Sequence, residues 1–258
     1  MKKIPKDWYT NPPDAEQIPP TVLVVITDAG YKDGVVGICV RLRGSERQYA
    51  DKKFTARAKG PVHAELKAVK AALQRVRGLQ KRFEKILIYT DSAYAYNFLT
   101  NTWIAQKPYI RNVLDDISKL EEEVEGEIEY IHVKGKHIKA VDKKAGKIRK
   151  QEEKRVAERV EKRKERVKRC IREGRKMHVE IVGGEYRVWP KEGGVPPGYK
   201  VTLDPPSCEC PWWQNNWANK PLYVQKARAL PCKHICAVAE HLGVDVFEIF
   251  KKAINRND

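Results

Sequence analysis

Apolar and charged segments alternate along the first part of the chain in the lengths expected of strands. Residues 21–28 (TVLVVITD) and 85–90 (KILIYT) are continuous apolar runs, which are typical of buried strands. Residues 35–41, 48–55 and 127–133 are similar runs bounded by glycine or charged residues, and they predict three further strands.

Helices are predicted between and after these strands. Residues 62–76 carry apolar side chains at the spacing of an amphipathic helix. Asp91 and Ser92 cap a second helix to about residue 99, and residues 110–124 predict a third. A fourth helix is expected from Asp142. The order β-β-β-α-β-α-α-β-α predicts an α/β domain with a mixed five-stranded sheet and flanking helices.

The charge pattern changes after this region. Residues 143–176 contain 17 Lys or Arg and six Glu, so the segment carries a net charge of +11. It has no proline and only a thin apolar stripe, which predicts a long exposed helix that acts as a spacer or contacts phosphates. The predicted organisation is a proline-rich irregular leader followed by three parts, with ranges 1–20, 21–146 (first domain), 147–176 (basic linker helix) and 177–258 (second domain).

The second domain has the pattern of a small β-rich module. Gly183 and Gly184 separate two short runs and predict a hairpin. Residues 199–203 predict a third strand, and residues 231–242 and 245–254 predict helices.

The overall charge indicates a polyanionic partner. The chain of 258 residues has 51 Lys and Arg against 34 Asp and Glu, a net charge of +17, which favours nucleic acid or an anionic membrane surface. No apolar run reaches the roughly 18 residues of a membrane span, and no signal-peptide pattern opens the chain, so a cytoplasmic location is expected. In that compartment the six cysteines are expected to be thiols or metal ligands.

Four acidic residues stand at strand ends and helix starts, where α/β folds gather their ligands. Asp28 ends the first strand, Glu65 lies in the first turn of the first long helix, Asp91 follows the second apolar run, and Asp142 begins the fourth helix. Singly, each is better explained as a cap or turn residue. Together they would raise one another's pKa unless divalent cations were bound. Two Mg²⁺ ions about 4 Å apart can activate water for phosphoryl displacement.

The order and neighbours of these acids resemble the type 1 ribonuclease H family, in its archaeal and plant-like subgroup. The resembling motifs are TDAG at 27–30, HAELKAVKAAL at 63–73, TDSAYAYNFL at 90–99 and HVKGKHIKAVDKKA at 132–145. The resemblance covers about residues 21–150 and implies the ribonuclease H fold and cleavage of the RNA strand of RNA–DNA hybrids. It also implies two Mg²⁺ or Mn²⁺ ions held by the catalytic residues Asp28, Glu65, Asp91 and Asp142.

Two features depart from that family's pattern. The short connection from Val133 to Asp142 has no room for the mobile histidine loop of many members. Lys136 or His137 would then assist proton transfer or product release, or else lie on a basic surface. The basic handle of bacterial members is also missing after Leu99, which gives the segment of charge +11 a possible role in substrate binding.

Three thiols and one imidazole follow the pattern CxC…CxH in the second domain. They are Cys208, Cys210, Cys232 and His234. This set is typical of one structural Zn²⁺ ion, because residues two apart in a strand share a face and the second pair falls at a helix start. Cys236, one helical turn after Cys232, is an alternative ligand, and Cys39 and Cys170 are expected to be plain thiols.

The spacing of these ligands, the preceding strands and the helix sequence PCKHICAVAEHL resemble a SWIM zinc finger over roughly residues 177–245. The resemblance implies binding of nucleic acid or of a protein partner. Trp212, Trp213 and Trp217 lie between the two ligand pairs, where core packing and base stacking explain them equally well.

The sequence therefore predicts a metal-dependent endonuclease for RNA–DNA hybrids, with a zinc module that aids nucleic-acid binding. One alternative is a nuclease of the same fold that acts on DNA junctions, flaps or double-stranded RNA. Another is a non-catalytic nucleic-acid-binding protein. The complete set of acids argues against the second alternative, because a pure binder gains nothing from clustered negative charges near phosphates.

Overall fold

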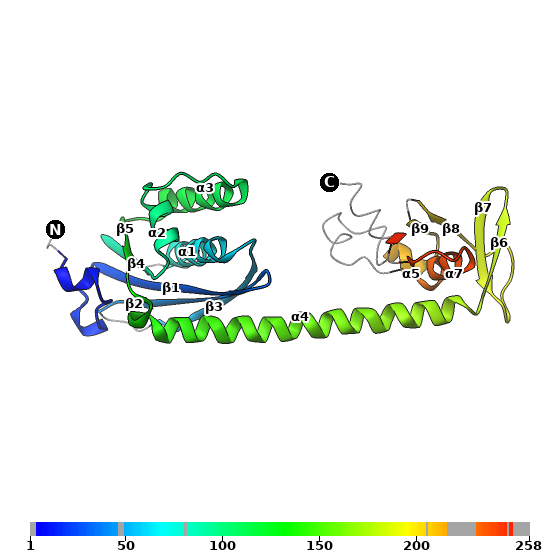
Figure 1. Ribbon diagram of the computed structural model, residues 1–258, viewed down its shortest axis with the longest axis horizontal. Coiled ribbons are helices and arrows are strands. Elements are labelled where there is room, and N and C mark those ends of the chain that lie inside the picture. Colours follow the sequence, from blue (N-terminus) through cyan, green and yellow to red (C-terminus); the bar gives the residue numbers. More distant parts are fainter. Residues whose placement is uncertain are drawn as a thin grey trace. The chain divides into compact units, whose positions relative to one another are not determined.

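A mixed five-stranded sheet forms the first part of the molecule (Figure 1). The computed structural model describes residues 4–45, 49–79, 82–204, 206–215, 231–246 and 248–249. Contacts within the chain divide it into two units, Met1–Val156 and Ala157–Asp258.

The sheet of the first unit has the strand order β3-β2-β1-β4-β5. Its strands are β1 (Val22–Lys32), β2 (Val35–Arg43), β3 (Lys52–Arg57), β4 (Lys85–Thr90) and β5 (Glu127–His132). β2 is antiparallel to β1 and β3, whereas β4 is parallel to β1 and β5. The predicted fold class is therefore confirmed. β3 starts later and ends later than the strand predicted at 48–55, whose first residue lies outside the described residues.

Both faces of the sheet are covered, which explains the continuous apolar runs. Helices α1 (Pro61–Arg77), α2 (Ala93–Leu99) and α3 (Pro108–Glu123) lie on one face (Figure 1). Leu23 and Val25 of β1 join the core on that face, and Val24 and Ile26 join the core on the other. Successive residues of a strand point to opposite sides, so a strand buried on both faces must be apolar throughout.

Helix α4 (Lys139–Gly174) covers the second face with its first turns. Val141, Ala145 and Ile148 are buried against the sheet. The close approach requires Gly37 of β2, where a Cβ atom would lie 2.2 Å from the backbone nitrogen of Arg149. The last helix of the first unit and the basic helix are therefore one continuous element.

The proline-rich leader is also part of this second core. It contains two short 3-10 helices, η1 (Lys6–Tyr9) and η2 (Ala15–Gln17), rather than being irregular throughout. Trp8 is 5% exposed, and its carbonyl oxygen accepts a 2.9 Å hydrogen bond from the Tyr89 hydroxyl. Arg43 donates to the carbonyl oxygen of Pro13 at 2.8 Å. The leader thus packs beside α4 against the same face of the sheet.

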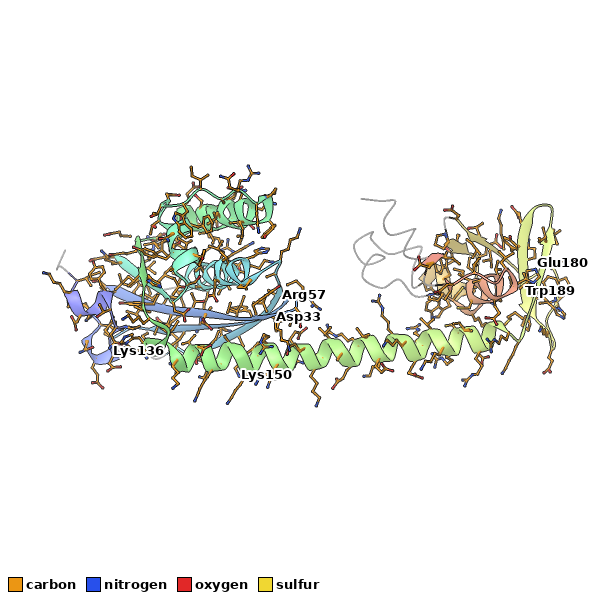
Figure 2. All side chains as sticks on the ribbon, viewed as in Figure 1. Asp33, Arg57, Lys136, Lys150, Glu180 and Trp189 are labelled. Atoms are coloured by element: carbon orange, nitrogen blue, oxygen red, sulfur yellow. The ribbon has the colours of Figure 1, made fainter. Side chains whose placement is uncertain are left out.

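The second unit contains a four-stranded antiparallel sheet in the order β6-β7-β8-β9. Its strands are β6 (Met177–Val182), β7 (Glu185–Pro190), β8 (Tyr199–Leu203) and β9 (Pro206–Cys208). Gly183 and Gly184 make the predicted hairpin turn with φ of 58° and 82°, which favour glycine. Trp189 of this hairpin, labelled with Glu180 in Figure 2, packs on His178 with ring centroids 5.8 Å apart.

Two helices complete the described part of this unit, α5 (Pro211–Trp213) and α7 (Lys233–His241). Trp213, Val188, Val201 and Val238 form its core, joined by Val167 from the later turns of α4. Most of the helix predicted at 245–254 lies outside the described residues. Among the helices that the structure describes, none is long and apolar enough to cross a membrane.

Candidate active site and metal centre

Three carboxylates meet where β1 and β4 lie side by side. Asp28 is on β1, Asp91 directly follows β4, and Glu65 is on α1, which packs against β1. One carboxylate oxygen of each residue lies within 4.8 Å of one from each of the others. The structure therefore brings together three of the four acids that the sequence singled out.

Asp142, the fourth acid, lies in the first turn of α4 and is exposed. Its carboxylate is not among the three that lie within 4.8 Å. Its negative charge nevertheless raises the pKa of Asp28, Glu65 and Asp91. Asp142 therefore stands at the solvent-exposed edge of the same acidic cluster.

Burial and mutual repulsion keep protons on this cluster in the absence of a cation. Burial, and then the charges of Asp91 and Asp142, raise the pKa of Asp28 to about 7. Burial and the charges of Asp28 and Asp91 raise the pKa of Glu65 well above its usual range. Converging carboxylate oxygens that resist ionisation are a donor set suited to hard divalent cations, whose charge replaces the bound protons.

Two residues beside Asp91 were not found by the sequence analysis. The Nε2 atom of His132, at the end of β5, lies 3.2 Å from the carbonyl oxygen of Asp91, and the charge of this histidine lowers the pKa of the aspartate. A Cβ atom on Gly135 would lie 2.8 Å from Oδ2 of Asp91. Both residues fall within the segment 132–145, but nothing in the pattern marked them, because their partner is distant in sequence.

The turn before α4 contains the two residues considered for proton transfer. They belong to the short helix η3 (Gly135–His137). His137 Nδ1 lies 3.1 Å from Oδ1 of Asn11 in the leader. Lys136 is exposed on the surface (Figure 2). The contact with Asn11 gives His137 a role in holding the leader.

Aromatic and basic side chains form a surface around the α2–α3 connection. Residues 100–107 of this connection contain no helix. Trp103 is 43% exposed, and its ring meets that of Tyr94 edge-on at 5.3 Å. The amino groups of Lys59 and Lys107 lie 5.4 Å and 5.9 Å from the Tyr109 ring centre.

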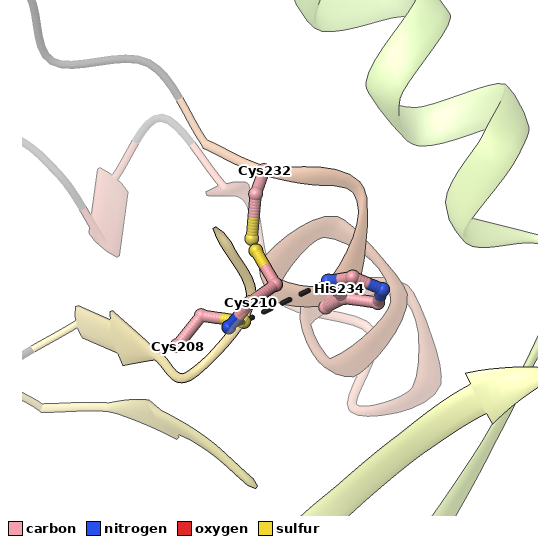
Figure 3. Close-up of side chains that lie close together, drawn as sticks. All are labelled: Cys208, Cys210, Cys232 and His234. Carbon is pink, nitrogen blue, oxygen red and sulfur yellow. Dashed lines mark hydrogen bonds between the residues drawn. The ribbon is translucent and has the colours of Figure 1, made fainter. Parts of the chain in front are cut away.

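A second cluster lies in the second unit, where two pairs of residues converge (Figure 3). Its members are all buried, with ligand atoms within 4.8 Å of one another: Cys208, Cys210, Cys232 and His234. Cys208 ends β9, Cys210 caps α5, and Cys232 caps α7, on whose first turn His234 stands. The Cys208 sulfur lies 3.7 Å from His234 Nδ1.

Backbone groups support negative charge on these sulfurs. The amide of Cys210 donates to the Cys208 sulfur, and that of Trp213 donates to the Cys210 sulfur, both at 3.4 Å. Thiol donors on Cys208 and Cys232 lower the pKa of Cys210, whereas hydrogen bonds to Cys208 and Cys210 raise that of Cys232. Three cysteine sulfurs and an imidazole nitrogen that converge in this way form a donor set that fits tetrahedral zinc.

The remaining candidates of this region separate into different environments. Cys236 lies outside the four-residue cluster and instead shares a hydrogen bond with Cys170 of α4. Trp213 is 1% exposed and belongs to the core, whereas Trp212 is half-buried. Trp217 lies outside the described residues.

Several solved structures are similar to this chain. One is the structure of LC11-RNase H1, a protein isolated from compost, in complex with an RNA/DNA hybrid. It is 13% identical to this chain with a TM-score of 0.46, and the match covers 50% of this chain and 97% of that one. The N-terminal RNase H domain of Rv2228c from Mycobacterium tuberculosis is 16% identical (TM-score 0.43; 51% and 98% covered). RNase H1 from Halobacterium salinarum is 20% identical (TM-score 0.40; 48% and 96% covered).

Comparison with known families gives two matches along the chain. No curated protein sequence matches it significantly. Residues 199–243, which include the cysteine and histidine cluster, match the SWIM zinc finger. Residues 20–181, more than half of the chain, match RNase H, and this range contains all four acids. The chain therefore belongs to the ribonuclease H family and carries a SWIM zinc finger in its second unit.

Proposed function

We propose that this chain is a metal-dependent endonuclease that hydrolyses the RNA strand of RNA–DNA hybrids. The observation that carries the proposal is the convergence of Asp28, Glu65 and Asp91 within 4.8 Å. Such a cluster is costly for folding, because each of these buried or half-buried carboxylates opposes the ionisation of the others. In a chain of the ribonuclease H family, that cost is explained by a requirement for cations at the site of phosphodiester hydrolysis.

The four acids would together bind two Mg²⁺ or Mn²⁺ ions. Asp28 and Asp91 would hold one ion, and Glu65 and Asp142 would position the second together with the attacking water. When bound, the ions supply a water of lowered pKa and positive charge for the in-line displacement at phosphorus. No residue of the chain needs to form a covalent bond to the substrate.

Neighbouring residues would keep Asp91 in place during this reaction. His132 donates from Nε2 to the Asp91 carbonyl oxygen, which anchors the backbone that follows β4. Gly135 leaves space for the turn before α4 to approach the Asp91 carboxylate. Asp142, at the exposed edge of the cluster, is the acid that an incoming phosphate and its water would meet first.

The second unit would add affinity for nucleic acid through charge and through its zinc module. α4 continues as a basic helix into this unit, and four sulfur and nitrogen ligands there fit one structural zinc ion. A second binding element in the same chain raises the local concentration of substrate without new contacts at the active site.

The first prediction concerns catalysis. Asp91→Asn removes one negative ligand and should lower hybrid hydrolysis at least about 100-fold, because cation-dependent stabilisation contributes several kcal/mol to the transition state. Hybrid binding should change little. Asp115→Asn, the same change at an exposed position of α3, is the matched control.

The measurement is cleavage of a labelled hybrid with Mg²⁺, beside DNA and RNA duplexes of the same sequence. EDTA should stop the wild-type protein, and Mg²⁺ or Mn²⁺ should restore it. Full activity of Asp91→Asn would refute the cation-based mechanism. Preferential cleavage of another substrate, such as a DNA junction, a flap or double-stranded RNA, would refute the hybrid specificity.

The second prediction concerns the pH dependence of stability in metal-free protein. The folded protein holds a proton on Asp28 up to about pH 7, whereas an unfolded chain releases it near about pH 3.9. The folded state therefore binds more protons between these values, and the contribution of Asp28 to stability falls as pH rises through this window.

Asp28→Asn removes this titration. The thermal midpoint of the variant, relative to the wild type in EDTA, should rise between about pH 4 and about pH 7. Mg²⁺ should raise the wild-type midpoint at neutral pH and affect the variant much less. If the thermal midpoints of the two proteins changed with pH in parallel, the pKa of Asp28 would not be raised in the folded protein, and the prediction would be wrong.

The third prediction concerns zinc. One zinc ion per chain should copurify, and Cys232→Ser should abolish it and unfold the zinc module, because structural zinc supplies much of a small domain's folding energy. Cys170→Ser, outside the four-residue cluster, should retain the metal. Elemental analysis and circular dichroism make the comparison. A folded wild-type module without zinc would contradict the assignment.

The fourth prediction concerns the contribution of the second unit to binding. Truncation after Val156 keeps Ile148 and the Arg149–Glu153 ion pair, which belong to the first unit. It should weaken hybrid binding at least about tenfold at low salt, and the loss should shrink as salt rises, because Lys and Arg contacts release counterions.

Changing Lys162, Arg163 and Lys164 to Glu should reproduce part of this loss and flatten the salt dependence. Dissociation constants at three salt concentrations, measured in the Asp91→Asn background to prevent cleavage, test both variants. An unchanged constant and salt slope after truncation would show that the helix is a spacer and that the zinc module serves a protein partner.

A further inference from the structure

A pocket of about 600 Å³ opens in the second unit beside the zinc centre. Its walls come from five elements: Arg166 and Arg169 from α4, Pro190 from β7, Tyr199 from β8, Trp212 from α5, and Lys233 from α7. Three residues of the cysteine and histidine cluster also line it: Cys210, Cys232 and His234. A volume of this size lies within the range of small-molecule sites and suits a group as large as a nucleotide.

The pocket carries uncompensated positive charge. Its lining contains one acid, Glu173, which lies 3.7 Å from the Lys176 amino group and 4.0 Å from Arg172. These two cations, which are not part of the lining, offset its charge. Within the part of the chain that the structure describes, Arg169 and Lys233 have no ion-pair partner. The pocket therefore favours an anion.

The pocket also contains a flat aromatic surface, which lies close to a third cation, Arg166. The guanidinium carbon of Arg166 is 4.8 Å from the centre of the Trp212 ring. Trp212 is half-buried and packs against the core of the unit, so the orientation of its ring is held by the fold. Tyr199 adds a second ring, 4.9 Å from that of His234. An indole that faces a guanidinium in a pocket can accept the face of a nucleobase in the same way.

We propose that this pocket binds one nucleotide of an unpaired strand, with its base on Trp212 and its phosphate on Arg169 and Lys233. The inference rests on the proposed function, in which the zinc module binds nucleic acid. Bases within a duplex already stack on their neighbours and expose only their edges, so a recessed aromatic ring is accessible only to an unpaired base. The basic, exposed surface of α4 can contact duplex phosphates without selecting for unpaired bases.

An acidic peptide could also satisfy the cations of this pocket. It would make no use of the aromatic ring of Trp212 in the pocket wall, whereas a nucleotide uses both the charge and the ring. The combination of Trp212 with Arg169 and Lys233 therefore favours the nucleotide.

The test measures binding of short labelled single strands, ten nucleotides of DNA or RNA, to the full-length zinc-loaded protein in the Asp91→Asn background. Trp212→Ala should weaken binding at least about fivefold, and Trp212→Phe should retain most of it, because each stacked base contributes about 1–3 kcal/mol. Arg169→Glu should weaken binding more than Lys164→Glu, which makes a charge reversal at an exposed position of α4 outside the pocket. Zinc content and thermal midpoint identify variants that fail to fold.

The inference is overturned if folded Trp212→Ala and Trp212→Phe bind as the wild type does, or if Arg169→Glu and Lys164→Glu lose affinity equally. It is also overturned if a short polyglutamate peptide binds more tightly than the strands and loses its binding in Arg169→Glu. Hybrid cleavage, measured with an intact Asp91, separates the two proposals. Cleavage with no pocket-dependent strand binding refutes the pocket alone, and pocket-dependent binding without any cleavage refutes the nuclease alone.

Discussion

Electrostatic repulsion among buried and half-buried carboxylates is the constraint on which the first unit depends. Asp28, Glu65 and Asp91 come from two strands and a helix that are adjacent in space but distant in sequence, and their convergence raises the pKa of each. Such a cluster is stable only if the backbone that carries it cannot relax. The sheet supplies that rigidity because it is packed on both faces, by α1–α3 on one side and by α4 with the leader on the other.

The second unit also brings candidate metal ligands together, but their donor atoms are sulfur and nitrogen and not oxygen. Three thiols and an imidazole converge beside a sheet of four short strands, whose core of Trp213 and a few aliphatic residues is small. A domain of this size gains much of its folding energy from a bound metal, whereas the large core of the first unit can hold its acids before a cation arrives. Oxygen ligands suit magnesium or manganese and sulfur ligands suit zinc, so the two centres would not compete for the same ion.

Much of this arrangement could be predicted from the sequence, because it depends on local patterns. The apolar run at 85–90 is β4, residues 199–203 are β8, and Asp91 directly follows β4 as expected. β1 instead continues to Lys32, so Asp28 lies inside this strand and not at its end, and Glu65 lies beyond the first turn of α1, because the hydrophobic pattern does not fix element ends. Trp8 was missed because an isolated tryptophan among prolines has no periodicity to reveal its burial. Gly135 and His132 were missed because their roles arise from contact with Asp91, and the pocket was missed because its walls come from five separate elements.

Helix α4 shows why charge in this chain is better explained by binding than by folding. Its early turns bury Ile148 in the first core, and its later turns bury Val167 in the core of the second unit, so apolar packing holds both ends. Between them, pairs such as Glu165–Lys168 stabilise the exposed turns. Residues 143–176 contain six Glu for 17 Lys and Arg, so the segment keeps a net charge of +11 although many of its cations are paired. A stable exposed helix needs no such surplus, since like charges along it repel, and under the proposed function this surplus would contact a polyanion.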